Sequence, residues 1–133
     1  DKTIEMGIVS NSQCYTPLLF DVFWGKALEA LGFNKNMCSW SYRSSCAKPS
    51  LRLFQPVMEF IGRERPFAPD QVLYVGNDVL NDIQPARSLG CRTALFAGDQ
   101  RSLRMRSDRP ELAGVKPDVV ITELGQLAGL LVG

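Results

Sequence analysis

Short apolar runs, each followed at once by small polar residues, alternate along this chain with segments of helical spacing. The clearest run covers residues 71–75 and stops at Gly76-Asn77-Asp78. Continuous apolar runs of this length are typical of strands buried on both faces, and their alternation with helices favours a parallel sheet. The sequence therefore predicts an α/β fold, namely a doubly wound parallel sheet with helices on both faces.

The remaining elements follow from the same patterns. Further strands are predicted at residues 6–9, 37–42, 93–97 and 119–121. Helical spacing predicts helices from Thr16 to residue 31, across residues 51–61 and 83–89, and from a cap at Thr122 to residue 131. Pro56 lies inside the second of these helices. We expect a kink or a restart there, because proline removes a backbone donor.

Length and composition fit one soluble domain over residues 1–133. The chain is 45% hydrophobic and 22% charged, with a formal net charge of +1. This near-neutral balance gives no support for a nucleic-acid partner. The sequence has no apolar run long enough to span a membrane and no signal-peptide pattern near residue 1, so a cytoplasmic location without membrane association is expected.

Cysteine and histidine usage narrows the possible chemistry. The four cysteines show no Cys-x-x-Cys spacing and histidine is absent, so free, mostly buried thiols are expected rather than a zinc site. Without histidine, the usual general base is missing as well. Any catalysis has to use carboxylates, a lysine, hydroxyls or a hard metal ion.

Polar residues follow three of the predicted strands, where ligands bind in open parallel sheets. Ser10 and Asn11 follow the first strand, and Lys48 lies in the loop after the second. A hydroxyl and backbone amides can donate to phosphoryl oxygens, and a lysine can neutralise their charge. These three residues are the candidate phosphate-binding set, with Ser10 and Lys48 as candidate catalytic residues.

Hard oxygen ligands gather after the third predicted strand. Asn77, Asp78 and Asp82, with Asn81 beside them, carry the oxygens that Mg²⁺ prefers. Each feature alone has a structural explanation, because Ser-Asn suits a turn and Asp82 could serve the N-terminus of a helix. Their occurrence in order, each after a strand, favours a phosphate and magnesium site.

These residues resemble the later motifs of the haloacid dehalogenase (HAD) superfamily. The similarity lies in Ser10-Asn11 after a strand, then Lys48-Pro49, then the stretch from Val75-Gly76-Asn77-Asp78 to Asn81-Asp82-Ile83. It extends from about residue 6 to residue 121. The resemblance implies a Mg²⁺-dependent phosphatase-like hydrolase that acts on a small phosphomonoester, with Ser10 binding the phosphoryl group, Lys48 neutralising charge and Asp78 or Asp82 holding the metal.

Two departures from the family pattern stand out. Asn77 replaces the acidic residue usual after Gly76, and no Asp-x-Asp, the motif of the family's nucleophile, occurs anywhere in the chain. In the family that aspartate forms an aspartyl-phosphate. We therefore expect an incomplete core that lacks the central strand and any cap and is inactive alone. Its exposed strand edge would favour self-association or pairing with the missing segment.

Other interpretations remain open. A receiver-like or scaffold domain could hold phosphate or metal without turnover, whereas a dinucleotide-binding domain is disfavoured because no Gly-x-Gly-x-x-Gly follows a strand. Residues 100–110 are polar and rich in arginine, with Arg101, Arg104, Arg106 and Arg109. They could meet an anionic partner, but a solvated loop is the favoured interpretation.

Overall fold

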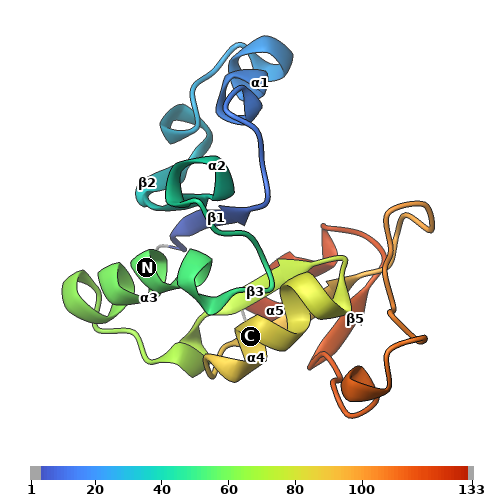
Figure 1. Cartoon of the computed structure of the whole chain (residues 1–133). Coiled ribbons are helices and arrows are strands. Elements are labelled where there is room, and N and C mark those ends of the chain that lie inside the picture. Colours follow the sequence, from blue (N-terminus) through green and yellow to red (C-terminus); the bar gives the residue numbers. More distant parts are fainter. Residues whose placement is uncertain (1–3, 132–133) are drawn as a thin grey trace. The chain divides into compact units, whose positions relative to one another are not determined.

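The computed structural model describes residues 4–131, which divide into two compact units with the boundary between Phe67 and Ala68. We call them the N-terminal and C-terminal units. Each contains a parallel sheet with helices, so the predicted α/β class is confirmed (Figure 1). Within residues 4–131, no helix has the length and apolar character needed to cross a membrane.

The N-terminal unit is built on two parallel strands, β1 (Met6–Ser10) and β2 (Phe33–Trp40). The register pairs Ile8 with Cys38 and Ser10 with Trp40, and it is irregular between Met6 and Ile8. Gly7 lies at that irregularity, where a Cβ atom would overlap the backbone oxygen of Met37. A residue without a side chain is therefore required for the two strands to approach each other here.

The connection between these strands differs from the prediction. The predicted helix over 16–31 is wrong in extent, because α1 (Thr16–Trp24) ends at Gly25, whose φ of 62° starts a left-handed cap. A short 3₁₀ turn, Glu29–Leu31, then leads to Gly32. The second strand begins four residues earlier than predicted, and Ser41–Ser44 form a short helix, α2, instead of continuing that strand.

Helix α3 (Leu51–Glu64) packs against both strands of this unit. Its buried residues Leu53, Phe54, Val57 and Ile61 recur at the spacing of one helix face. The helix runs through Pro56 without the predicted restart. Pro56 is exposed, so its ring lies on the solvent side of the helix and not in the apolar face.

The C-terminal unit holds a three-stranded parallel sheet in the order β3 (Leu73–Gly76), β4 (Arg92–Phe96), β5 (Val119–Ile121). A π-helical turn, Val79–Ile83, follows β3 and leads into α4 (Gln84–Ser88). Val79, Ile83, Leu95 and Leu112 form the buried apolar cluster of this unit. The turn after β3 is thus anchored in the core at both ends.

Two boundaries in this unit lie more than one residue from the prediction. The third strand begins at Leu73, because a 3₁₀ turn over Pro69–Gln71 precedes it. The last helix, α5 (Gln126–Leu131), begins four residues after Thr122, so Thr122 does not cap it. The side chain of Gln126 instead accepts the backbone N–H groups of Thr122 and Glu123.

Candidate functional site

The turn after β3 is organised around the carboxylate of Asp82, which is only 4% exposed. Its Oδ2 accepts the backbone N–H groups of Asn77 at 3.1 Å and Asp78 at 3.0 Å. A Cβ atom at position 76 would overlap the Cβ and Cγ atoms of Asp82. Gly76 is therefore required so that this carboxylate can reach the backbone of the turn.

Asp78 bonds to both the backbone and the side chains around the turn. Its carboxylate caps the turn by accepting the backbone N–H groups of Leu80 at 2.9 Å and Asn81 at 3.3 Å. It also accepts the Asn81 side-chain amide at 2.9 Å and the Arg106 guanidinium, with Nε at 3.0 Å and Nη2 at 2.5 Å. Burial by itself would raise the pKa of Asp78, but the hydrogen bonds from Arg106 and the turn outweigh burial, so the pKa is lowered.

Asn77 is bound to the chain through its backbone and through its amide nitrogen. Nδ2 donates to the Ser102 carbonyl at 2.9 Å, and the Asn77 carbonyl accepts the Arg104 N–H at 2.8 Å. The side-chain Oδ1 of Asn77 accepts no hydrogen bond from another residue between 4 and 131. It is an oxygen that the fold leaves available to a ligand.

Tyr74 lies on β3 beside the same carboxylate. Its hydroxyl donates to Asp82 Oδ1 at 3.3 Å. Burial first, and then the neighbouring negative charge of Asp82, raise the pKa of this phenol, so it stays protonated and remains a donor. Tyr74 was not among the predicted site residues. Its position two residues before Gly76, on the strand that carries the motif, is the signal that could have identified it.

The prediction of a solvated loop for residues 100–110 is wrong for Arg106. Its guanidinium forms the ion pair with Asp78, whereas Arg109 pairs with Glu111 at 3.2 Å and Arg104 donates to the carbonyls of Arg101 and Leu103. The backbone is bound as well, because the Val79 N–H donates to the Arg104 carbonyl at 2.9 Å. The segment is therefore part of the turn's structure.

The N-terminal unit brings together the predicted phosphate-binding residues. Asn11 Oδ1 accepts the backbone N–H of Lys48 at 2.6 Å, and Asn11 Nδ2 donates to the Lys48 carbonyl at 3.3 Å. Ser10 is the last residue of β1, directly before Asn11. The amide of Asn11 thus fixes the loop that carries Lys48 against the end of β1.

A second connection, which the sequence did not reveal, joins the segment after β1 to the residue that follows β2. The Ser12 N–H donates to Ser41 Oγ at 2.9 Å, and Ser41 Oγ donates to the Ser12 carbonyl at 3.2 Å. Ser41 follows β2, so its hydroxyl bridges the carboxyl ends of the two strands. Serines in loops are too common to be singled out from a sequence, which is why this bridge was missed.

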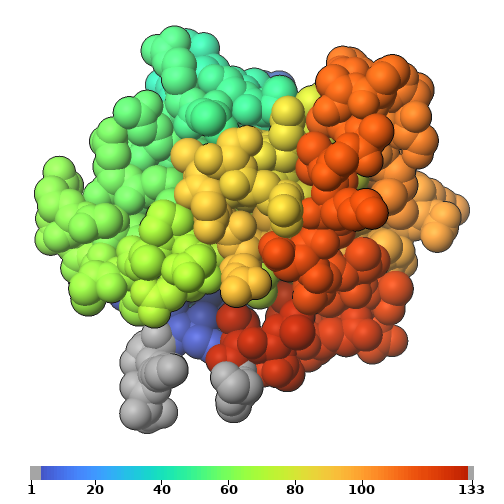
Figure 2. Space-filling view, turned by 90° about the horizontal axis from the view of Figure 1, so that it is seen from below, coloured from blue at the N-terminus to red at the C-terminus, as the bar shows by residue number. Residues whose placement is uncertain are grey.

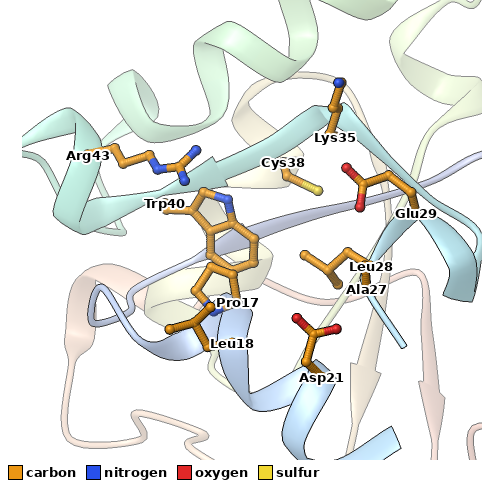
Figure 3. A pocket seen from close by; sticks show the side chains of 10 residues that line it. All are labelled: Pro17, Leu18, Asp21, Ala27, Leu28, Glu29, Lys35, Cys38, Trp40 and Arg43. Carbon is orange, nitrogen blue, oxygen red and sulfur yellow. The ribbon is translucent and has the colours of Figure 1, made fainter. Parts of the chain in front are cut away.

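A cavity of about 280 Å³ opens elsewhere in the N-terminal unit, between α1 and β2 (Figure 3). Trp40 and Leu28 form apolar walls, and the carboxylates of Asp21 and Glu29 face inward in the same view. None of the predicted site residues lines it. The cavity is therefore separate from the candidate phosphate-binding loop.

The side chains after β3 can be tested against the needs of Mg²⁺, which uses one or two carboxylates together with water and phosphate oxygens. Asp82 and the Oδ1 atom of Asn77 are hard oxygen donors of this kind, and Asp82, which is 4% exposed, already accepts three hydrogen bonds. Asp78 does not fit while Arg106 holds it, because five N–H groups already point at a carboxylate with about four lone-pair positions. Among residues 4–131, no group of three or more histidine, cysteine, aspartate or glutamate side chains is arranged to hold a metal.

The four cysteines are free, as expected, but they are less buried than expected. Cys91 is buried, Cys38 and Cys46 are half-buried, and Cys14 is exposed. Burial raises the pKa of the thiols of Cys91 and Cys38, which disfavours the reactive thiolate. These two thiols therefore have the properties of packing residues.

Known structures share this fold. The putative HAD-hydrolase YfnB from Bacillus subtilis, solved bound to magnesium, matches with a TM-score of 0.70 and 23% identity, over 96% of this chain and 49% of that chain. A HAD phosphatase from Thermococcus onnurineus matches with a TM-score of 0.67 and 20% identity, over 96% of this chain and 50% of that one. No protein-family model matches the chain, and no curated protein sequence does.

The chain therefore has the α/β fold of HAD hydrolases, as the resemblance of its motifs implied. It spans about half the length of each of these two solved structures.

Proposed function

We propose that residues 1–133 are part of the catalytic core of a Mg²⁺-dependent HAD-type phosphatase that acts on a small phosphomonoester. The observation that carries the proposal is that oxygen and nitrogen groups suited to phosphate and Mg²⁺ follow β1 and β3 in a chain with this fold. Ligands bind at the carboxyl ends of strands in open parallel sheets. The magnesium-bound neighbour supports the choice of metal.

Each residue has a proposed role. The Ser10 hydroxyl and the amide groups of Asn11 donate to the oxygens of the transferred phosphoryl group, and the Lys48 amine neutralises its charge. Asn77 and Asp82 supply metal oxygens, with Asp78 in the same turn. Mg²⁺, when bound, stabilises the charge that develops on the phosphoryl oxygens.

The attacking carboxylate is proposed to come from outside these residues, since the chain contains no Asp-x-Asp. It would attack phosphorus, expel the alcohol and form an aspartyl-phosphate that water then hydrolyses. We infer that the 133-residue chain alone has no turnover. The protein that includes this nucleophile is called the parent protein below.

Strand pairing is the proposed means of association. Within the described part of each sheet, β1 pairs only with β2, and β3 pairs with β4 on one side only. Unpaired strand edges attract a further strand. The partner is either the nucleophile-bearing segment or a second copy, and we expect the isolated chain to show concentration-dependent self-association in sedimentation experiments. A strictly monomeric chain would contradict this part of the proposal.

The role of Lys48 can be tested with the parent protein, p-nitrophenyl phosphate and Mg²⁺. Lys48→Ala should reduce kcat at least about a hundredfold, because the charge on the phosphoryl group loses its compensating cation. Lys116→Ala is the matched control, because Lys116 is exposed and also precedes a proline. Equal activity of the two variants would remove Lys48 from the mechanism.

The role of Asp82 needs a variant that keeps the turn intact. Asp82→Asn retains an oxygen that can accept the Asn77 and Asp78 N–H groups, but it removes the charge. We expect activity to fall sharply and to be partly restored by raised Mg²⁺ concentration. The exposed Asp70→Asn is the control. Wild-type Mg²⁺ dependence in Asp82→Asn would contradict a metal-binding role.

A further inference from the structure

Residues 99–109, here called the arginine segment, are attached to the turn after β3 at several points. Arg104 forms an isolated parallel bridge with Asp78, through the Arg104 N–H to the Asn77 carbonyl at 2.8 Å and the Val79 N–H to the Arg104 carbonyl at 2.9 Å. Figure 2 shows the segment, in orange, on the surface of the C-terminal unit. Through the Asp78–Arg104 bridge, the arginine segment pairs like a short strand beside the candidate metal residues.

The Arg106 side chain completes this attachment. Its two-pronged contact with Asp78 is partly shielded from water, with 30% of the Arg106 side chain and 10% of the Asp78 side chain exposed. Arg106 also has a φ of 58°, which a residue with a Cβ rarely adopts. Such a conformation persists only where the surrounding contacts fix it. The Asp78 contact is therefore a defined feature of the fold.

The same segment fixes the side chain of Asn77. A backbone carbonyl can only accept a hydrogen bond, so the Ser102 carbonyl requires the amide nitrogen of Asn77 on its side. The opposite atom, Oδ1, is then the one presented away from the segment. Groups that orient a metal ligand in this way commonly affect metal affinity tenfold to about a hundredfold.

We propose that Arg106 is a positioning residue. Its ion pair with Asp78, here called the latch, holds the arginine segment against the turn after β3, and the segment in this position orients the Asn77 oxygen as a metal donor. Asp78 is then the anchor of the latch and not a metal ligand. This inference rests on the proposed function for its use of Mg²⁺. It narrows the metal donors after β3 to Asn77 and Asp82.

The latch is tested first without metal, on the 133-residue chain, by NMR. Arg106→Gln should increase hydrogen exchange about tenfold at the Asn77 side-chain amide and the Val79 N–H, because a charge-assisted pair is lost. Arg106→Lys should retain part of the protection. Arg101→Gln, in the same segment, should exchange like wild type, since the Arg101 side chain makes no hydrogen bond or ion pair within residues 4–131. Unchanged exchange in Arg106→Gln would overturn the proposal.

Metal affinity is the second readout, measured by calorimetry with Mg²⁺ alone on the parent protein. Arg106→Gln should weaken binding about tenfold. Loss of a positive charge by itself would strengthen Mg²⁺ binding, in Arg106→Gln and in Arg101→Gln alike. Weaker Mg²⁺ binding in Arg106→Gln therefore reports the loss of the latch and not the change of charge. Binding that is unchanged or tighter in Arg106→Gln would overturn the positioning role.

Asp78→Asn distinguishes an anchor from a ligand. If Asp78 acts only through Arg106, then Asp78→Asn and Arg106→Gln remove the same contact and their effects should not add, so the double variant should bind Mg²⁺ no more weakly than Asp78→Asn alone. A far larger loss in Asp78→Asn would show that Asp78 is a ligand and overturn this assignment. If the wild-type parent protein binds no Mg²⁺ at millimolar concentration, the proposed function fails, and the latch is still decided by the exchange of the Asn77 amide.

Discussion

The turn after β3 and the loop after β1 hold their polar residues by different means. Asp78 and Asp82 are 7% and 4% exposed, and together they accept at least eight hydrogen bonds. In the N-terminal unit, Asn11 is exposed, and two hydrogen bonds join its amide to the backbone of Lys48. One region is rigidified by its carboxylates, whereas the other is held mainly by a side-chain amide.

This difference shows that a carboxylate in a motif can serve the fold as much as the chemistry. Removing one partner of a buried, hydrogen-bonded carboxylate leaves an uncompensated polar group, which is costly. Removing an exposed amide leaves groups that water can satisfy. Changes at the turn after β3 should therefore affect stability strongly, and changes at the loop after β1 should affect activity more than stability.

The largest effect is expected for Gly76→Ala. The new Cβ atom would overlap the Asp82 side chain, which must then leave the two N–H groups it accepts. We expect a loss of about 3 kcal/mol in the free energy of unfolding, at the upper end of typical overpacking costs. Gly114→Ala is the control, because a Cβ atom added there would meet open space within 4 Å. Urea denaturation measures both, and equal stability would show that the turn tolerates a shifted Asp82.

An intermediate effect is expected for Thr93→Val. Thr93 is completely buried, and its hydroxyl donates to Asp118 at 2.8 Å and accepts the Asp118 N–H at 3.1 Å. A valine of similar shape removes both bonds, but Asp118 Oδ2 still accepts the Thr93 N–H and the Asp118 N–H still donates to the Thr93 carbonyl, so the loss should be about 1.5 kcal/mol. Thr122→Val, at an exposed position, should change the midpoint of thermal unfolding little. A wild-type midpoint for Thr93→Val would mean that this bond adds no stability.

A smaller effect on stability is expected for Asn11→Ala. Because the Lys48 backbone groups that Asn11 binds lie in an exposed loop, the loss should be at most about 1 kcal/mol. Activity of the parent protein should fall more, since Lys48 is no longer held near the end of β1. The exposed Asn36→Ala is the matched control. A large loss of stability with normal kcat would reverse the contrast between the two regions.

The smallest effect concerns the pH dependence that Asp118 contributes. Hydrogen bonds from Thr93, and the nearby charges of Arg87 and Arg92, lower the pKa of Asp118. Since the folded-state pKa lies below the unfolded value, this stabilisation is complete above about pH 4 and is lost as the pH falls through the folded-state pKa. Asp118→Asn should therefore flatten the acid limb of stability below about pH 4. An unchanged acid limb would assign this pH dependence to other carboxylates.

Much of the C-terminal unit could be predicted from the sequence. An apolar run precedes Gly76 and two Asn-Asp pairs follow it, which is typical of a strand followed by a polar turn. The structure has both. A structural role for Asp82 was expected as an alternative to metal binding, but at the N-terminus of the following helix, whereas Asp82 accepts the N–H groups of Asn77 and Asp78 before it. Arg106 was not, because its pairing with Asp78 depends on a contact across 28 residues that local patterns do not encode.

The N-terminal unit was harder to predict for local reasons. Apolar residues recur at helical spacing from residue 18 to residue 31, and Gly25 does not interrupt that pattern. The left-handed conformation of Gly25 nevertheless ends α1. The first half of β2 was not predicted as a strand, because Asn34, Lys35 and Asn36 are polar and give no apolar pattern. These three residues lie between Phe33, which pairs with Met6, and Cys38, which pairs with Ile8, and local patterns do not encode such an irregularity of the ladder.

The central claim is the proposed function, in which the groups after β1 bind phosphate and the oxygens of Asn77 and Asp82 bind the metal. Paramagnetic broadening by Mn²⁺ in the presence of inorganic phosphate, read by NMR on the parent protein, tests it most directly. The account predicts strong broadening at Asn77 and Asp82, and chemical-shift changes at Ser10, Asn11 and Lys48 when inorganic phosphate alone is added. The absence of either effect would contradict it.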